Sequence, residues 1–476
     1  MSNGVTSEGS GWRRWGARSF RWHEWWGRQR RRWRLVGLTT RRGGDLVATR
    51  VRSVRADDER RAELDEGFAI RSAADAANQL GQMKGAVMKL GQMMSFVNDA
   101  LPPEAQAALA QLQADAPPMA PSLAAGVVRD ELGADPTVVF ADWEPVPVAA
   151  ASIGQVHRAT LADGRAVAVK VQYPGVESSI GADLADGERI GRLLSAVSLR
   201  SVDVPALADE LRLRMADELD YRIEAAHQHA FAERFAGHPS MRVPDVVAEL
   251  SGRRVLTTEW ADGMTFAEFE RSADEPPRQR AAETIFRFAQ SSIIQARLFN
   301  GDPHPGNYRF AADGSVTFLD FGLVKQLDDD DHARLMQVLD GVLALDASAT
   351  TQAMVDAGFL AADHGLDPGH VFDCVSAPYR AYFHDQFTFT PSYTGDALRS
   401  LIDVRGPYAD VLAALDMPPS FVLIDRVVWG VSALLGRLGA TNRWRAIVGE
   451  YRADGPPATP LGHDEATWRS GWPRSG

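Results

Sequence analysis

One stretch of the chain, NGDPHPGN at residues 300–307, restricts the fold more than any other. Asp302 precedes Pro303, and a residue before proline is pushed out of helical geometry. Pro305-Gly306 then predicts a turn that returns Asn307 towards Asp302. The stretch therefore predicts an ordered loop that brings a carboxylate and an amide together.

A second loop is expected shortly afterwards. Asp313-Gly314 predicts a turn, and the following VTFLDFG predicts a short apolar strand that ends in Asp320, with Gly322 allowing a sharp exit. Two carboxylates and an amide oxygen on neighbouring loops are hard oxygen ligands of the kind that Mg²⁺ takes together with phosphate oxygens.

Asp and Asn also cap ordinary turns, so Asp302 or Asn307 alone indicates little. The complete spacing, Asp-x-x-x-x-Asn followed by Asp-Phe-Gly, is typical of phosphoryl-transfer sites. It predicts that Asp302 positions or deprotonates the acceptor while Asn307 and Asp320 hold the metal. We expect His304 to be a packed or hydrogen-bonded loop residue rather than a metal ligand.

Lysine is rare in this chain, which makes each lysine informative. The sequence has 51 Lys plus Arg, and the lysines are Lys84, Lys89, Lys170 and Lys325. A lysine retained where arginine is otherwise used indicates a position that needs a compact ammonium rather than a guanidinium fork. Lys170 ends the strand-like AVAVK, so we expect it to contact the phosphates of a nucleotide.

A phosphate-binding lysine needs a carboxylate to orient it, and DELDYRIEA at 217–225 offers Glu218, Asp220 and Glu224. On a helix, Glu218 and Asp220 point about 200° apart, whereas Asp220 and Glu224 share a face. We assign Glu218 to Lys170, and leave Asp220 and Glu224 to another surface or to solvent.

A loop that covers the phosphates should precede the lysine strand. The kinase pattern G-x-G-x-x-G-x-V, aligned on Val156, places Ala149, Ala151 and Gly154 at its glycine positions. Alanine methyl groups would hold this loop away from the phosphates and alter the nucleotide preference. The expected nucleotide contacts are Ala149, Ala151, Ser152, Gly154, Val156, Lys170 and Glu259.

Changes in composition and in the predicted secondary structure along the chain suggest five segments. They are a basic Trp/Arg-rich arm (1–62), a helical extension (63–135), a small β-rich nucleotide-binding lobe (136–262), a large helical lobe (263–455) and a disordered tail (456–476). This α+β order suits a nucleotide held in a cleft between two lobes.

The charge and the cysteine content restrict the cellular environment that the chain is suited to. The single cysteine, Cys374, excludes an internal disulfide and a Cys-rich metal site, so a reducing cytoplasmic setting is expected. No run of 18 apolar residues and no secretory signal is present. The net charge is −12, yet residues 11–34 hold nine Arg against one Glu. Trp and Arg in this arm fit an interfacial helix on anionic lipid, at the inner face of a membrane, better than specific binding of nucleic acid.

With these motifs in order, residues 63–453 resemble the UbiB (AarF/UbiB) family of atypical, protein-kinase-like proteins. The motifs that carry the resemblance are KLGQ (89–92), AAASIGQVHRA (149–159), VAVKVQYPG (167–175), ELDYRIEA (218–225), DPHPGN (302–307) and LDFG (319–322).

The resemblance implies a protein-kinase-like two-lobed fold in which the N-terminal helical extension packs over the cleft. Lys89 and Gln92 of the K-x-G-Q motif would meet the acidic Asp220 and Glu224 and suppress protein phosphorylation. ATP or ADP with Mg²⁺, ATPase activity and support of isoprenoid-quinone synthesis at membranes are also implied, with quinone-synthesis enzymes or lipid as partners. The chain departs from the family in having Asn300 where His is common, in lacking Ala-Pro-Glu after Asp-Phe-Gly, and in lacking C-terminal membrane helices.

Two rivals remain open from the sequence. A small-molecule phosphotransferase of the aminoglycoside or choline kind shares a similar HPGN and DFG pair, and a non-catalytic nucleotide-binding scaffold would keep the same side chains.

Overall fold

The computed structural model describes residues 119–151, 153–176, 219–395 and 406–471. The chain divides into two units, and all described residues belong to the second, Asn78–Gly476. The basic arm, the K-x-G-Q motif, Ser152 and Glu218 lie outside the described residues.

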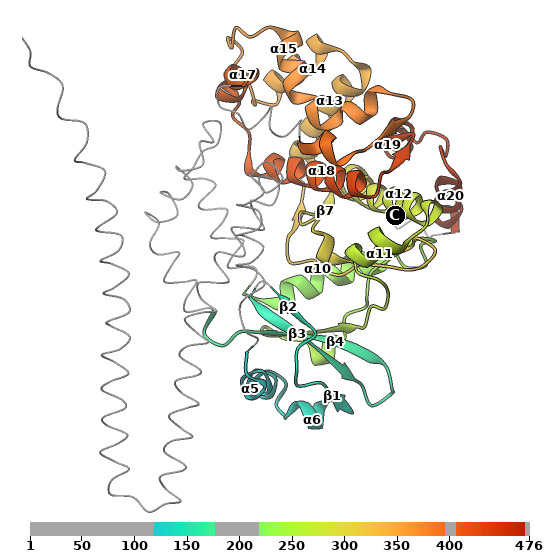
Figure 1. Ribbon diagram of the computed structural model, residues 1–476. Helices are drawn as coiled ribbons and strands as arrows, with labels where there is room; N and C mark the ends of the chain where they lie inside the picture. The colour runs from blue at the N-terminus through green and yellow to red at the C-terminus, as the bar shows by residue number, and fades with distance from the viewer. Residues whose placement is uncertain (1–118, 152, 177–218, 396–405, 472–476) are drawn as a thin grey trace, which may run out of the picture. The chain divides into compact units, whose positions relative to one another are not determined.

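An antiparallel sheet of five strands lies in the N-terminal part of the described chain (Figure 1). Its strands are β1 (Asp142–Trp143), β2 (Ala149–Ala151), β3 (Gly154–Thr160), β4 (Ala166–Gln172) and β6 (Val255–Glu259). They follow the order β1-β3-β4-β6, with β2 also paired to β3. β3 and β4 form the predicted hairpin, and Gly164 in its turn has a φ of 86°, which glycine adopts without steric cost.

One face of this sheet is covered by α5 (Pro121–Leu132), with the short α6 (Pro136–Val139) beside β1. Val167, Val169 and Val171 of β4 are fully buried in the core beneath α5. Because side chains alternate along a strand, Lys170 is turned to the opposite face. The alternation read from AVAVK is thereby confirmed.

Helices dominate after the sheet, as predicted from the sequence. The helices of the described chain beyond α6 are α10 (Tyr221–Arg234), η1 (Ala248–Leu250), α11 (Phe266–Ser272), α12 (Glu275–Gln290), η3 (Pro305–Asn307), α13 (Asp329–Ala344), α14 (Ala347–Asp356), α15 (Pro368–Val375), η4 (Ala377–Phe383), α17 (Ala409–Ala414), α18 (Pro419–Arg437), α19 (Trp444–Arg452) and α20 (Pro460–Gly471). One π-helical turn, η2 (Ser291–Ala296), extends α12. Short strands between them are β5 (Met241–Arg242), β7 (Leu298–Asn300), β8 (Tyr308–Phe310), β9 (Val316–Phe318), β10 (Val324–Gln326), β11 (Phe387–Thr388) and β12 (Thr441–Asn442).

A large apolar core holds the helical part together, and α12 lies at its centre. α18 packs along α12, as Figure 1 shows. Phe288 of α12 stacks on Phe318 of β9, with ring centres 3.8 Å apart. β9 pairs with β8 in antiparallel register, which confirms the predicted strand before Asp320. Because β8 directly follows the loop that ends at Asn307, this pairing joins the two loops of the site.

Among the described helices, none is long and apolar enough to cross a bilayer.

The C-terminal segment contradicts the expected disordered tail, because residues 460–471 form α20. Glu465 of this helix is 2% exposed and accepts hydrogen bonds from Arg287 and Tyr451. Arg287, which is fully buried, also pairs with Glu283 and Glu450. The Pro/Gly-rich composition of the C-terminal segment favoured disorder. Composition does not reveal that Arg287, far away in the sequence, pairs with Glu465 and holds this segment in place.

Ending the chain at Gly455 should therefore destabilise the fold markedly. The buried Arg287 would lose one of its carboxylates, and removing one partner from a buried ion-pair network typically costs about 3–5 kcal/mol. Thermal unfolding followed by circular dichroism measures the effect. A chain ending at Gly471 is the matched control and should melt like the full chain, whereas equal melting of both truncations would show that α20 contributes nothing.

Candidate active site

Lys170 is the centre of a charged cluster that joins the sheet to the helical part. Its ammonium donates to both carboxylate oxygens of Glu224, at 2.8 and 2.9 Å, and to Oδ2 of Asp320 at 3.5 Å. The ammonium also lies 5.1 Å from the ring centre of Tyr221. Its side chain is 17% exposed and that of Glu224 is 7% exposed, so little solvent screens the pair.

The protonation state of Lys170 follows from this setting. Burial disfavours the ammonium, but the carboxylates of Asp320 and Glu224 outweigh it and hold the pKa of Lys170 well above its ordinary value. Lys170 is therefore a fixed positive charge at any physiological pH, as a phosphate-binding residue needs to be.

The predicted pairing of Glu218 with Lys170 is wrong, because Glu224 is the carboxylate that binds the Lys170 ammonium. A helical wheel is valid for Glu218 only if one helix runs through residue 218, but α10 begins at Tyr221 and Asp220 is its N-cap. Glu224 lies in the first turn of α10, where its carboxylate reaches β4. Glu218 precedes the helix and lies outside the described residues.

Asp220 serves α10 itself in the described structure. Its carboxylate accepts from the backbone N–H of Arg222 and from the Arg222 guanidinium. The Arg222 side chain lowers the pKa of Asp220 from its ordinary value. The predicted contacts of Lys89 and Gln92 with the acidic pair lie outside the described residues and stay predictions.

The predicted phosphate loop is a tight hairpin between β2 and β3. Ala149 pairs with Val156 and Ala151 pairs with Gly154, while Ser152 is outside the described residues. Val156 is in register with Lys170, which places it next to the ammonium-bearing strand position. These residues stay predicted nucleotide contacts.

Gly154 has a packing reason to be glycine. A Cβ atom there would lie 2.3 Å from the carbonyl oxygen of Val171 and 2.9 Å from the Tyr221 hydroxyl. The glycine thus lets β3 approach β4 and α10 closely. The two alanines lie on β2, where Ala149 is exposed and Ala151 is half-buried.

Asp302 and Asn307 are brought together as predicted. The Pro305-Gly306-Asn307 segment forms a single 3-10 turn, and Nδ2 of Asn307 donates to Oδ2 of Asp302 at 2.9 Å and to its carbonyl oxygen at 3.1 Å. His304 Nδ1 accepts from the backbone N–H of Gly306, so in the structure it is a hydrogen-bonded loop residue.

Asn300 links the two polar loops, a role that the sequence did not reveal. Its Oδ1 accepts from the backbone N–H of Asp302 at 2.9 Å, and its Nδ2 donates to the carbonyl oxygen of Asp320 at 2.5 Å. The amide can accept and donate at once, so it holds Asp302 and Asp320 in fixed relation. Asn300, where His is common in the family, is therefore well suited to join these two loops.

Arg426 is the functional candidate that sequence reasoning missed. Its Nη2 donates to Oδ1 of Asp302 at 2.5 Å, and both side chains are more than nine-tenths buried. Arg426 comes from α18, 124 residues after Asp302. One signal was available in the sequence, since Asp425 and Arg426 interrupt the otherwise apolar run FVLIDRVVWG. A buried arginine needs a partner, but the sequence does not name it.

Asp320 completes the cluster at the end of β9. Its Oδ1 accepts from the backbone N–H of Gly322 at 3.0 Å, while Oδ2 faces Lys170. Its side chain is 34% exposed, the most open carboxylate of the cluster. Phe321 is fully buried against Phe231 of α10, so the Asp-Phe-Gly segment is fixed by the core.

The donor atoms fit Mg²⁺ bound together with phosphate. The amide nitrogen of Asn307 is committed to Asp302, which leaves the amide oxygen as its ligating atom, and Asp320 adds an exposed carboxylate. Within the described ranges, no three His, Cys, Asp or Glu side chains surround one common metal position. Mg²⁺ needs no such cage, since it uses one or two protein carboxylates and keeps water or phosphate oxygens.

Glu259 is not brought into this cluster by any described contact. It ends β6, pairs in register with Val167, and accepts from Arg242 at 3.0 Å. Its predicted nucleotide contact remains a prediction.

The chain matches known proteins across most of its described length. The family described as the ABC1 atypical kinase-like domain matches residues 111–354. The chloroplastic Protein ACTIVITY OF BC1 COMPLEX KINASE 3 of Arabidopsis thaliana is 29% identical over 399 residues, which cover 83% of this chain and 54% of the relative. ACTIVITY OF BC1 COMPLEX KINASE 1 of the same plant is 32% identical over 308 residues, covering 64% and 45%. The chain thus spans about half the length of these curated relatives.

A solved structure agrees with the sequence matches. The complex of Rv3197 with erythromycin from Mycobacterium tuberculosis has a TM-score of 0.58 and 31% sequence identity, covering 83% of this chain and 98% of that chain. The kinase-like α+β fold expected from the motifs is confirmed. The chain belongs to the ABC1 atypical kinase-like domain family, which is the UbiB family.

Proposed function

We propose that this kinase-like protein binds Mg·ATP and transfers its terminal phosphoryl group, to water or to a second acceptor. The observation that carries the proposal is the pairing of Lys170 with Glu224 beside Asp320, with Asp302 and Asn307 fixed next to them through Asn300. Phosphoryl transfer depends chiefly on positioning and on charge stabilisation, and these are the properties that this cluster has.

Each side chain has a defined task in this proposal. Glu224 holds the Lys170 ammonium in place for the phosphates, and Asp302 orients the acceptor hydroxyl and takes its proton. Arg426 and Asn307 fix the two oxygens of Asp302. Mg²⁺, held by Asn307 and Asp320, would neutralise phosphate charge.

The first test is ADP release from Mg·ATP by the purified chain, with and without anionic liposomes. Asp320→Asn should lower release by roughly 10²-fold or more, because it removes a metal-binding charge that stabilises the transferring group. Asp313→Asn is the matched control, since Asp313 is an exposed residue of the β8–β9 turn that bonds Ser315. Binding of Mg·ATP without release by the unmodified chain would instead favour the non-catalytic scaffold.

The membrane-linked role is the finer part of the proposal. We propose that the arm at 11–34 attaches the protein to an anionic membrane surface and that the ATPase supports quinone or related lipid metabolism there. The support is the balance of nine Arg to one Glu, interleaved with Trp. Unchanged co-sedimentation with anionic liposomes after deletion of residues 1–40 would contradict the attachment.

A second candidate is phosphorylation of a hydroxylated small molecule. The structural relative was solved with erythromycin, which favours including a macrolide among the compounds tested. Stoichiometric phosphate on such a compound, lost in Asp302→Asn, would identify this activity. Release of phosphate to water alone would count against it.

A further inference from the structure

The helix α18 approaches the catalytic loop at one position without a side chain. A Cβ atom on Gly430 would lie 2.3 Å from Cγ of Pro303, whereas ordinary contacts of this kind lie at 3.4–4 Å. Pro303 would have to retreat by at least about 0.7 Å to admit a methyl group, and by about 1.1 Å to restore an ordinary contact. Pro303 is the residue after Asp302, and its ring is joined to the backbone, so the displacement would pass directly into the loop.

Gly430 and Arg426 are one helical turn apart and therefore share a face of α18. From that face, Arg426 donates to Asp302 while Gly430 lies against Pro303. The arginine draws the loop towards the helix, and the glycine determines how close the loop can come. The two contacts together hold Asp302 from the side of α18.

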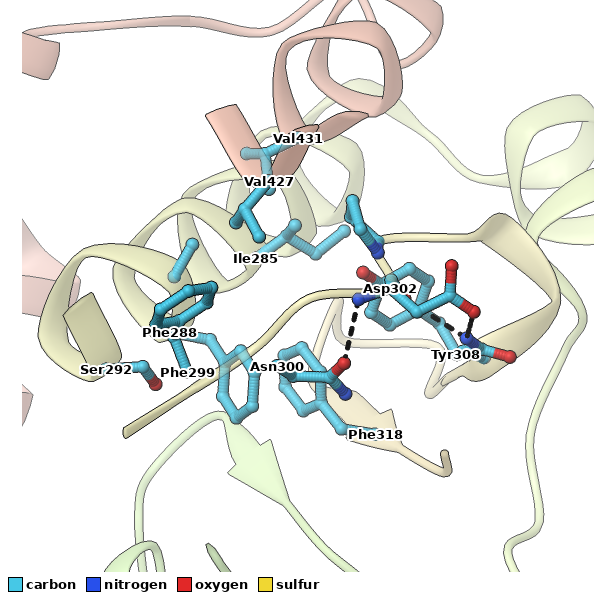
Figure 2. A pocket seen from close by; sticks show the side chains of 13 residues that line it. Ile285, Phe288, Ser292, Phe299, Asn300, Asp302, Tyr308, Phe318, Val427 and Val431 are labelled. Carbon is cyan, nitrogen blue, oxygen red and sulfur yellow. Dashed lines mark hydrogen bonds between the residues drawn. The ribbon is translucent and has the colours of Figure 1, made fainter. Parts of the chain in front are cut away.

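The surroundings decide which side would yield to a larger residue. A cavity adjoins this contact, lined by Pro303 and Asp302 of the loop, Val427 and Val431 of α18, and Ile285 of α12 (Figure 2). This cavity is small, with a volume of about 20 Å³. Val427 and Val431 are buried and α18 packs along α12, so the helix is held by the core. We therefore expect the loop, rather than the helix, to move.

We propose that Gly430 is a positioning residue for phosphoryl transfer, which sets the distance between α18 and the catalytic loop and thereby places Asp302. The inference rests on the proposed function. Lys170 and Glu224, on β4 and α10, are held by their own ion pair rather than by this contact. Larger residues at 430 should therefore lower turnover more than they lower nucleotide affinity.

Gly430→Ala tests the proposal by separating turnover from binding. We expect the turnover number to fall by roughly 10- to 100-fold, because misplacing a reacting group by about 1 Å costs up to about 10²-fold. The Kd for Mg·nucleotide should stay within about twofold. Gly449→Ala on α19 is the matched control, since a Cβ there meets nothing within 4 Å. Its turnover should be unchanged.

A second variant distinguishes positioning from a general loss of stability. Pro303→Ala removes the ring atom nearest to Gly430, so Gly430→Ala should cost several-fold less turnover in that background than in the unmodified chain. Equal losses in both backgrounds would overturn the proposal, as would unmodified turnover in Gly430→Ala.

Hydrogen–deuterium exchange provides a readout that does not require turnover. In Gly430→Ala, exchange should rise at the loop amides of Gly301, Asn307 and Leu319, which donate to Leu323, His304 and Asn307 respectively. The control Gly449→Ala should leave these amides unchanged. If the unmodified chain bound Mg·ATP without turning it over, the proposed function would fail while this exchange pattern still decided the inference. Faster exchange spread over the whole chain, without a loop-specific rise, would overturn it.

Discussion

Replacing Lys170 by Met should reduce ADP release from Mg·ATP by roughly 10²- to 10³-fold, the scale expected when a preorganised charge at the reacting group is lost. The ammonium is nearly buried and paired with Glu224 at 2.8 Å, so no nearby solvent could replace it. Steady-state release of ADP measures the effect. Lys325→Met is the matched control, because Lys325 is another lysine close in sequence to the Asp-Phe-Gly segment and belongs to β10.

Two further substitutions test the reason for a lysine at this position. Lys170→Arg should also lose most activity, because a guanidinium fork cannot replace a compact ammonium that bonds both oxygens of Glu224. Glu224→Gln should weaken Mg·ATP binding and turnover together, since it leaves Lys170 without its nearest charge. Activity retained in Lys170→Arg would contradict the inference drawn from the rarity of lysine in this chain.

Replacing Arg426 by Met should have the second large effect, on both stability and turnover. Asp302 would keep a buried carboxylate without its cation, and breaking a buried ion pair from one side typically costs about 3–5 kcal/mol. The free Asp302 oxygen would also be less well oriented for the acceptor. Thermal unfolding and the turnover number measure the two consequences separately.

A control on the same helix makes this prediction specific. Arg437→Met removes an arginine of α18 that pairs with Glu270 near the surface, where such pairs contribute about 0–1 kcal/mol. Combining Arg426→Met with Asp302→Asn should recover part of the lost stability, because the buried charge is then removed from both sides. Equal melting temperatures for Arg426→Met and Arg437→Met would show that the buried pair has no special weight.

Local sequence was sufficient to predict several features of the fold and the site. The turn at Asp163-Gly164, the alternation that turns Lys170 away from the valines, and the Pro-Gly turn that returns Asn307 to Asp302 are all short-range effects. Proline and glycine restrict backbone angles, and a strand fixes the side of each residue, whatever the rest of the chain does. The same rules found the strand that ends before Asp320.

The pairing of distant charges could not be read in this way. A helical wheel that included residue 218 favoured Glu218 as the partner of Lys170, whereas in the structure α10 begins at Tyr221 and its Glu224 is the partner. The tail composition suggested disorder, and the structure placed Glu465 on Arg287. In both cases the partner was decided by where a helix begins or docks.

The sequence by itself therefore determined which chemical groups this protein holds and in which loops they lie, because turn and strand geometry are set by neighbouring residues. Only the tertiary structure decided which carboxylate orients Lys170, which arginine holds Asp302, and how closely Gly430 lets α18 approach Pro303. The physical reason is that a buried charge or a close contact is stabilised by whichever group the packing of whole elements brings within reach, however distant that group is along the chain.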